Sequence, residues 1–211
     1  ISCSLVGSEM CIRDSLRKYP LEERLHLEKI CHDELSDLYM LCKDKRAEEQ
    51  IGQCIDLHRK WLAMDDRFER PHRDTTGYMM RAYAKMVYLR DLISRDKLNE
   101  YYQKCIGLAR ARGDMAEIYS TSARYYQCTG DYERAVAYID STITAYKSKG
   151  IKADLAPIYA TQSYLYEKMG DYKNALKAVR TTNNIRFNER VEEAQSSLCL
   201  LYTSPSPRDC S

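Results

Sequence analysis

The feature that most constrains this chain is an internal repeat with a period of 40 residues. Gly130 and Gly170 each begin the string Gly-Asp-Tyr and lie 40 residues apart. Four further pairs of matching chemical type share this spacing: Tyr119 with Tyr159, Tyr126 with Tyr166, Ala135 with Ala175, and Ile139 with Val179. Coincident pairs at one period indicate duplication of a single structural unit, which is typical of proteins built from stacked repeats.

Each repeat unit has the pattern of two consecutive amphipathic helices. Apolar residues recur at intervals of three and four in the first half of the unit, as on one face of a helix. Gly130 is placed to end that helix, because glycine readily adopts the left-handed conformation that closes one, and Asp131 is placed to cap the next. Small residues, Ala123 and Ala135, would let the two helix backbones approach closely. The pattern therefore predicts an antiparallel helical hairpin.

The two units resemble tetratricopeptide repeats. The family pattern W-x2-L-G-x2-Y…A-x3-F is matched with tyrosine in place of tryptophan, and with Ser122 and Gln162 in place of leucine. The period of 40 exceeds the usual period of about 34, so we expect a longer second helix and link. The positions that carry the resemblance are Tyr119, Ala123, Tyr126, Gly130, Ala135, Tyr159, Tyr166, Gly170 and Ala175.

The resemblance implies an all-α fold, a right-handed α-solenoid of about four antiparallel helical hairpins. Upstream, Ala47-x3-Ile51 echoes Ala135-x3-Ile139, and Pro71 breaks the chain before a helix that we expect to start at residue 74 or 75. The sequence predicts hairpins at about residues 21–66, 75–112, 114–149 and 153–195, within a repeat domain of residues 16–198.

The two ends of the chain are related to each other as DNA. Codons that can encode residues 205–209 (Pro-Ser-Pro-Arg-Asp) encode, when read on the opposite strand, residues 5–8 (Leu-Val-Gly-Ser) and the first base of a codon that fits Glu9. The string also resembles the adapter DNA used in sequencing libraries. We therefore expect residues 1–15 and 199–211 to be adapter-derived and not native, as expression tags and fusion scars are. The alternative is a genuine Pro- and Ser-rich tail.

Composition excludes several classes of protein. The chain carries 33 Lys and Arg against 31 Asp and Glu, so it has no basic footprint for nucleic acid. No apolar run reaches the roughly 18–20 residues that span a membrane. Between residues 16 and 198 the cysteines are odd in number and scattered, which does not make a disulfide framework and favours a reducing, cytoplasmic compartment. They are Cys31, Cys42, Cys54, Cys105 and Cys128.

Candidates for chemistry are few. The segment HLEKICHDE contains His26, Cys31, His32 and Glu34, but these side chains point to different sides of a helix, whereas a closed zinc site needs about four converging ligands. We therefore expect no metal site there. The sequence has no phosphate-binding glycine loop, nucleophile elbow or paired-carboxylate signature. We expect no catalytic residues, no cofactor and no enzyme activity.

The tetratricopeptide resemblance implies that the first helix of each hairpin lines a concave surface that binds a partner protein or peptide. Arg124 and Lys168 could hold a carboxylate there; the alternative is an ordinary solvated helix face. The residues that the resemblance places on this surface are Glu117, Ser120, Arg124, Gln127, Tyr164, Glu167 and Lys168.

The leading functional hypothesis is a protein-interaction module. Long-period repeats followed by RFNERVEEAQSSL resemble the sensory regions of bacterial signalling proteins, where a coiled coil leads to a histidine kinase or DNA-binding domain; Val191 and Ala194 could begin such a helix. The alternatives are a stand-alone scaffold or adaptor, repeats that regulate an enzyme domain within the same protein, and a helical repeat of the pentatricopeptide type that binds nucleic acid. The mixed charges of the predicted surface disfavour the last.

Overall fold

The computed structural model describes residues 16–63, 75–89, 92–150 and 155–203. Within these ranges the chain forms helices and turns and no strand, so the prediction of an all-α protein is confirmed. The chain divides into two compact units, residues 1–128 and residues 129–211. Of the segments expected to be adapter-derived, residues 1–15 and 204–211 lie outside the described residues, and residues 199–203 belong to the last helix.

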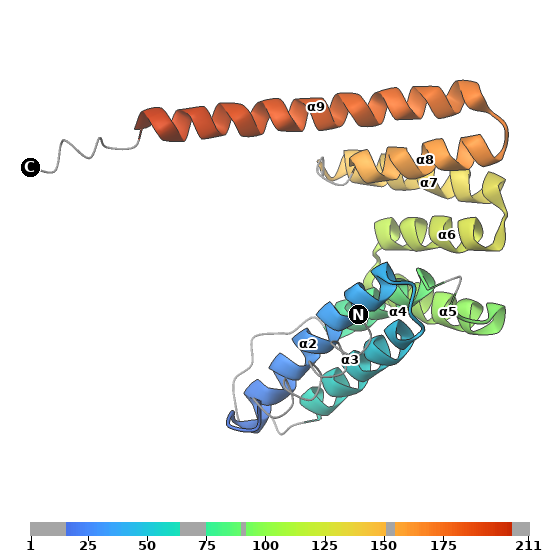
Figure 1. Ribbon diagram of the computed structural model, residues 1–211. Coiled ribbons are helices and arrows are strands. Elements are labelled where there is room, and N and C mark those ends of the chain that lie inside the picture. The colour runs from blue at the N-terminus through green and yellow to red at the C-terminus, as the bar shows by residue number, and fades with distance from the viewer. Residues whose placement is uncertain (1–15, 64–74, 90–91, 151–154, 204–211) are drawn as a thin grey trace, which may run out of the picture. The chain divides into compact units, whose positions relative to one another are not determined.

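Unit 1 contains two pairs of packed helices and a fifth helix (Figure 1). The first pair packs α2 against α3, the second packs α4 against α5, and α3 also contacts α4. The segment around Pro71 lies outside the described residues. The helices are α2 (Leu21–Leu41), α3 (Arg46–Leu62), α4 (Thr75–Val87), α5 (Arg95–Arg112) and α6 (Met115–Thr129), of which α6 ends one residue into unit 2.

One apolar core joins the helices of unit 1. Tyr39 of α2 is fully buried, and Ile51 of α3 is almost so. The same cluster takes in side chains of α4 and α5, and Ile118 of α6 packs against it. These residues recur at helical spacing in the sequence, so each helix contributes one apolar face. The buried members are Leu35, Tyr39, Ala47, Ile51, Ile55, Met80, Ala82, Tyr83, Met86, Leu89, Cys105 and Ala109.

Unit 2 contains α7 (Tyr132–Ser148), α8 (Leu155–Lys168) and α9 (Tyr172–Thr203). In this unit α7 packs against α8, and α8 packs against α9. The two Gly-Asp-Tyr strings form near-identical turns. Gly130 and Gly170 have φ angles of 83° and 77°, in the left-handed region that favours glycine.

Each turn glycine is followed by an aspartate that caps the next helix. Asp131 accepts a hydrogen bond from the backbone N–H of Arg134 at 3.2 Å, and Asp171 accepts one from Asn174 at 3.1 Å. The bonds from Asn174, from its backbone first, lower the pKa of Asp171. The glycine turn and the aspartate cap predicted from the repeat are both confirmed at these positions.

Candidate binding surfaces

Helix α6 carries four of the residues predicted to contact a partner, and the structure ties each of them to its neighbours. The Glu117 carboxylate accepts a hydrogen bond from the Thr121 hydroxyl at 2.7 Å. The Ser120 hydroxyl donates to the backbone carbonyl of Glu117 at 3.2 Å. Glu117, Ser120 and Arg124 are half-buried, whereas Gln127 is buried. The row is therefore an ordered polar edge rather than a freely solvated face.

Arg124 is the best-defined group on this edge. Its guanidinium carbon lies 4.2 Å from the centre of the Tyr88 ring, close enough for a cation–π contact. Its Nη1 donates to the side-chain oxygen of Gln127 at 3.0 Å. Within the described ranges Arg124 forms no ion pair with an acidic side chain. Tyr88 is half exposed, so the guanidinium and the ring together form an oriented cationic site at the surface.

The other three predicted contact residues lie on α8, in unit 2. The Lys168 ammonium lies 5.3 Å from the centre of the Tyr164 ring. Glu167 and Lys168 are exposed in the last turn of α8, and Tyr164 is half-buried. The α6 residues before Thr129 belong to unit 1, so the two sets are parts of different units.

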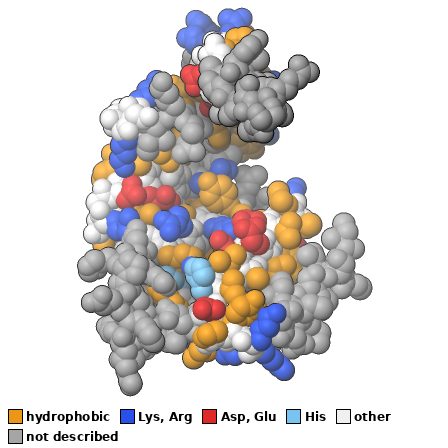
Figure 2. Space-filling view, turned by 90° about the vertical axis from the view of Figure 1, so that its left-hand side faces the viewer, with side chains coloured by type: hydrophobic (Ala, Val, Ile, Leu, Met, Phe, Trp, Pro, Cys, Tyr) orange, Lys and Arg blue, Asp and Glu red, His pale blue; other side chains and the backbone are white. Residues whose placement is uncertain are grey.

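Sequence reasoning missed a pocket of about 250 Å³ in unit 1. His58 lines this pocket, and the centre of its ring lies 4.2 Å from that of Tyr78 and 5.7 Å from that of Trp61. The Lys29 ammonium lies 4.4 Å from the centre of the Tyr78 ring. On the face drawn in Figure 2, histidine is exposed beside hydrophobic and acidic side chains. The pocket is lined by Leu25, His26, Lys29, Leu57, His58, Trp61, Tyr78 and Arg81.

The spacing of His58 and Trp61, three residues apart on α3, was the available signal for this pocket, because residues at that spacing share a helix face. Tyr78 comes from α4, across a segment that links the two helices, so its approach could not be derived from periodicity. Burial raises the pKa of the Tyr78 phenol, which keeps it neutral at ordinary pH. The pocket is apolar and aromatic, and the charged residues that line it are basic.

A larger groove of about 450 Å³ lies along α2 and α3, and it contains Cys31 and His32 of the segment considered for metal binding. His32 Nδ1 lies 2.6 Å from the side-chain oxygen of Gln50, and Glu28 pairs with Arg24 at 3.7 Å. Within the described ranges no three His, Cys, Asp or Glu side chains converge on one point. The groove carries both signs of charge, which gives it no preferred ligand.

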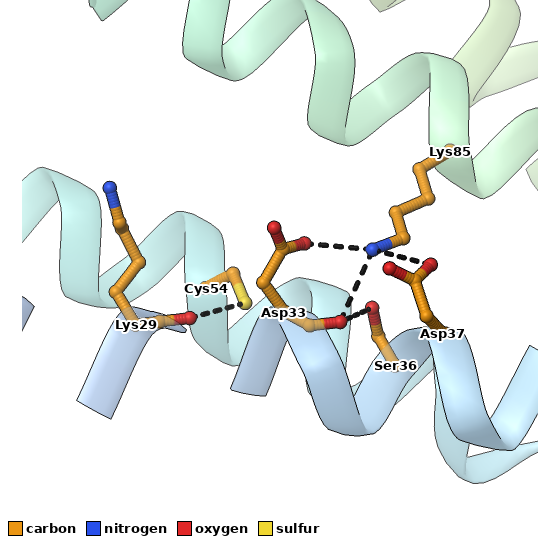
Figure 3. A network of polar contacts seen from close by, with 6 residues as sticks. All are labelled: Lys29, Asp33, Ser36, Asp37, Cys54 and Lys85. Carbon is orange, nitrogen blue, oxygen red and sulfur yellow. Dashed lines mark hydrogen bonds and ion pairs between the residues drawn. The ribbon is translucent and has the colours of Figure 1, made fainter. Parts of the chain in front are cut away.

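Lys85 is the centre of a polar cluster that ties α4 to α2. Figure 3 shows its ammonium between two carboxylates, 2.8 Å from Asp33 and 2.7 Å from Asp37. It also donates to the backbone carbonyl of Asp33 at 3.2 Å, and the Ser36 hydroxyl donates to the same carbonyl. Burial alone would lower the pKa of Lys85, but the hydrogen bonds to both carboxylates outweigh burial and raise it. The cluster is accounted for as a structural tether.

Replacing Lys85 with methionine should destabilise unit 1 by about 1–2 kcal/mol at pH 7, since a half-buried ammonium with two carboxylate partners is lost. The raised pKa places the stabilisation below pH ~10.4, the unfolded value, and removes it as the pH rises through the folded value. Urea titrations at pH 7 and pH 11 should therefore show that the free energies of unfolding of wild type and K85M differ less at the higher pH. Lys104→Met removes an exposed pair with Glu100 and should cost under ~0.5 kcal/mol. An equal cost for both variants would contradict the tether.

A second internal pairing joins α3 to α5. The Glu48 carboxylate accepts hydrogen bonds from the Lys97 ammonium and the Tyr101 hydroxyl, both at 2.7 Å. Burial alone would raise the pKa of Glu48, but these two hydrogen bonds lower it. As in the Lys85 cluster, the charged groups of this pairing bind each other within the fold. Arg124 is therefore the clearer candidate for binding a ligand.

The buried cysteines are structural. Cys105 is fully buried, and its thiol donates to the backbone carbonyl of Met80 at 3.5 Å. Burial raises the pKa of Cys105 to about 12 and that of Cys54 to about 11. Both thiols therefore stay protonated at neutral pH, unlike the thiolate that nucleophilic catalysis requires.

No helix in the part of the chain that the structure describes combines the length and the apolar character needed to cross a membrane.

Comparison with known proteins adds little to this geometry. No protein-family model and no curated protein matches the chain. Among solved structures, the chain is similar to BtubC (BKLC) from P. vanneervenii, at 14% sequence identity, with 82% of this chain and 93% of that chain covered. The TM-score is 0.38, which is too low to carry an argument about fold or function.

Proposed function

We propose that this chain is a protein-interaction module, a right-handed solenoid of tetratricopeptide type that binds a peptide or a helix of a partner protein. The repeated turn supports this proposal, because glycine and aspartate recur with matching backbone angles and matching caps at the starts of α7 and α9. Helical repeats of this kind present extended surfaces for recognition.

The observation that carries the proposal is the state of Arg124. Stacking on Tyr88 and the hydrogen bond to Gln127 hold the guanidinium in one orientation, and no carboxylate within the described ranges occupies it. An arginine that is already oriented loses less conformational entropy on binding a carboxylate than a mobile one. We infer that Arg124 binds an acidic side chain or the terminal carboxylate of the partner peptide, with Glu117 selecting a basic or polar neighbour.

The test uses an array of labelled 12-residue peptides that contain Asp or Glu, each paired with a twin in which Asn or Gln replaces the acid. Binding is measured by fluorescence anisotropy with the full chain. Because a charge-assisted hydrogen bond contributes about 1.5–3 kcal/mol, Arg124→Gln should weaken binding of the acidic peptides by ~10–100-fold. Arg95→Gln, at an exposed position of α5 outside the predicted surface, is the matched control and should leave binding unchanged.

Two outcomes would contradict the proposal. Equal binding of acidic peptides and their amide twins would remove Arg124 from the recognition of carboxylate. If no peptide bound at ~1 mM, every binding free energy would be weaker than about −4 kcal/mol. That result would contradict the proposal that the chain is an interaction module.

We further propose that the module is the sensory or regulatory part of a bacterial signalling protein. The length of α9 supports this: the helix runs from Tyr172 through residue 198, the last residue expected to be native, and a long helix suits the connection between a sensory region and an output domain. Sequencing of the source DNA beyond residues 16 and 198 tests it. A histidine kinase or DNA-binding domain after residue 198 is the expected result, whereas a stop codon there would favour a stand-alone adaptor.

A further inference from the structure

Helix α9 has one side packed on α8 and a second, apolar side that is exposed. Ala175, Ala178 and Thr182 are buried on the packed side. Five large apolar side chains lie on the other side, where a rotation of 100° per residue places them within an arc of about 120°. We call these five residues the α9 stripe: Tyr172 (70% exposed), Leu176 (52%), Val179 (40%), Phe187 (67%) and Val191 (38%).

The repeat itself identifies what covers such a face. Forty residues earlier, α7 carries Val136 and Ile139 at the positions of Leu176 and Val179, and both are buried, at 9% and 5% exposure. Helix α8 lies on that side of α7. The Gln162 amide donates to the Asp140 carboxylate at 2.6 Å there. One packed helix therefore covers on α7 the face that is exposed on α9.

The charges around the α9 stripe differ from those on α7. Arg180 stands at the position of Asp140, so the acceptor for an amide donor is replaced by a cation. The acidic residues Glu189, Glu192 and Glu193 fall on the opposite half of α9 by helical rotation. Five exposed basic side chains lie along this side of α9: Lys173, Lys177, Arg180, Arg186 and Arg190. By the same rotation Lys173 and Lys177 fall at one edge of the stripe and Arg186 at the other, whereas Arg180 and Arg190 fall within it.

We propose that the α9 stripe is a docking surface for an amphipathic helix of a partner protein whose apolar face is bordered by acidic residues. The helix would lie on α9 as α8 lies on α7, with a carboxylate opposite Arg180 where α8 offers the Gln162 amide. The apolar side chains supply the contact area, and the basic side chains within and beside the stripe select the sign of the partner's charge. This surface is separate from the α6 edge, so it adds a second interaction site to the proposed function.

The test uses two designed 18-residue helical peptides. One has leucine and alanine on one face and glutamate on both flanks, and its twin has lysine in place of every glutamate. Binding of each labelled peptide to the full chain is measured by fluorescence anisotropy. We expect saturable binding of the glutamate peptide, with the lysine peptide weaker by at least ~10-fold, because unlike charges attract and like charges repel at the rim.

Two variants of the chain locate the site. Phe187→Ser should weaken binding of the glutamate peptide by at least ~10-fold, since a large apolar side chain at the centre of an interface contributes much of the binding energy. Arg180→Glu should reduce the difference in affinity between the glutamate peptide and the lysine peptide. Leu41→Ser, at an 81% exposed leucine of α2, is the matched control and should change neither affinity. Arg124→Gln should also leave this binding unchanged, which separates the α9 stripe from the α6 edge.

Three results would overturn the proposal. Equal binding of the two peptides would remove the selection for acidic partners, and no saturable binding of either would remove the docking surface. A chain that forms a dimer by light scattering, and that loses the dimer with Phe187→Ser, would assign the stripe to a second copy of the chain instead.

Discussion

Replacing Tyr39 with alanine should destabilise unit 1 by about 3–5 kcal/mol, the usual cost of removing a large buried aromatic ring. Tyr39 is fully buried in the core that joins α2 to α5. The Arg46 guanidinium carbon also lies 4.4 Å from the centre of its ring, so the substitution removes a cation–π contact along with the packing. Urea denaturation followed by far-ultraviolet circular dichroism measures the change.

Two matched variants make this prediction specific. Tyr39→Phe keeps the ring and should cost well under half as much. Tyr172→Ala removes a tyrosine that is 70% exposed and should change the free energy of unfolding by less than ~0.5 kcal/mol. If Tyr39→Ala also stayed below ~1 kcal/mol, the core described here would be wrong.

The second large effect concerns cysteine reactivity. Cys105 should react with iodoacetamide at pH 8 about 10³-fold more slowly than a fully accessible thiol of ordinary pKa, because only ~10⁻⁴ of it is thiolate when the pKa is about 12. Burial slows the reaction further by excluding the reagent. Mass spectrometry of labelled peptides after timed quenching gives the rate at each site.

Cys42 is exposed and serves as the internal reference in the same sample. Cys54, with its pKa raised to about 11, should also be protected, and Cys31, which is half-buried, should fall between the extremes. Labelling of Cys105 within ~10-fold of Cys42 would show that its helix opens freely and would contradict the packing of α5.

The C-terminal half of the fold was predictable because its turns are determined by residues that are close together in the sequence. Gly130 and Asp131 fix a turn and a cap with bonds that span three or four residues, so sequence spacing alone locates them. The N-terminal half lacks this signal between α4 and α5, where no glycine closes the turn. There the helices are placed by contacts between distant residues, such as that of Lys85 with Asp33.

The candidate site was predictable only as a set of positions on a helix. Periodicity placed Arg124 and Gln127 on α6, but it could not indicate that Gln127 is buried and supports Arg124. The ring beneath Arg124 belongs to Tyr88, 36 residues earlier and on another element. Likewise the Tyr78 ring beside His58 comes from another helix and approaches through tertiary packing. Pairwise geometry of this kind is absent from any local pattern.

Trp61, at the wall of the aromatic pocket, is the one tryptophan of the chain and is 6% exposed. Intrinsic tryptophan emission therefore reports on unit 1 alone, whereas the dichroism signal sums the helices of both units. A denaturation followed by both signals at once contains an internal comparison: coincident midpoints mean that the two units unfold as one cooperative body, and separated midpoints give each unit its own stability. The unlabelled protein thus contains the probe needed to decide whether binding of a ligand to one unit changes the stability of the other.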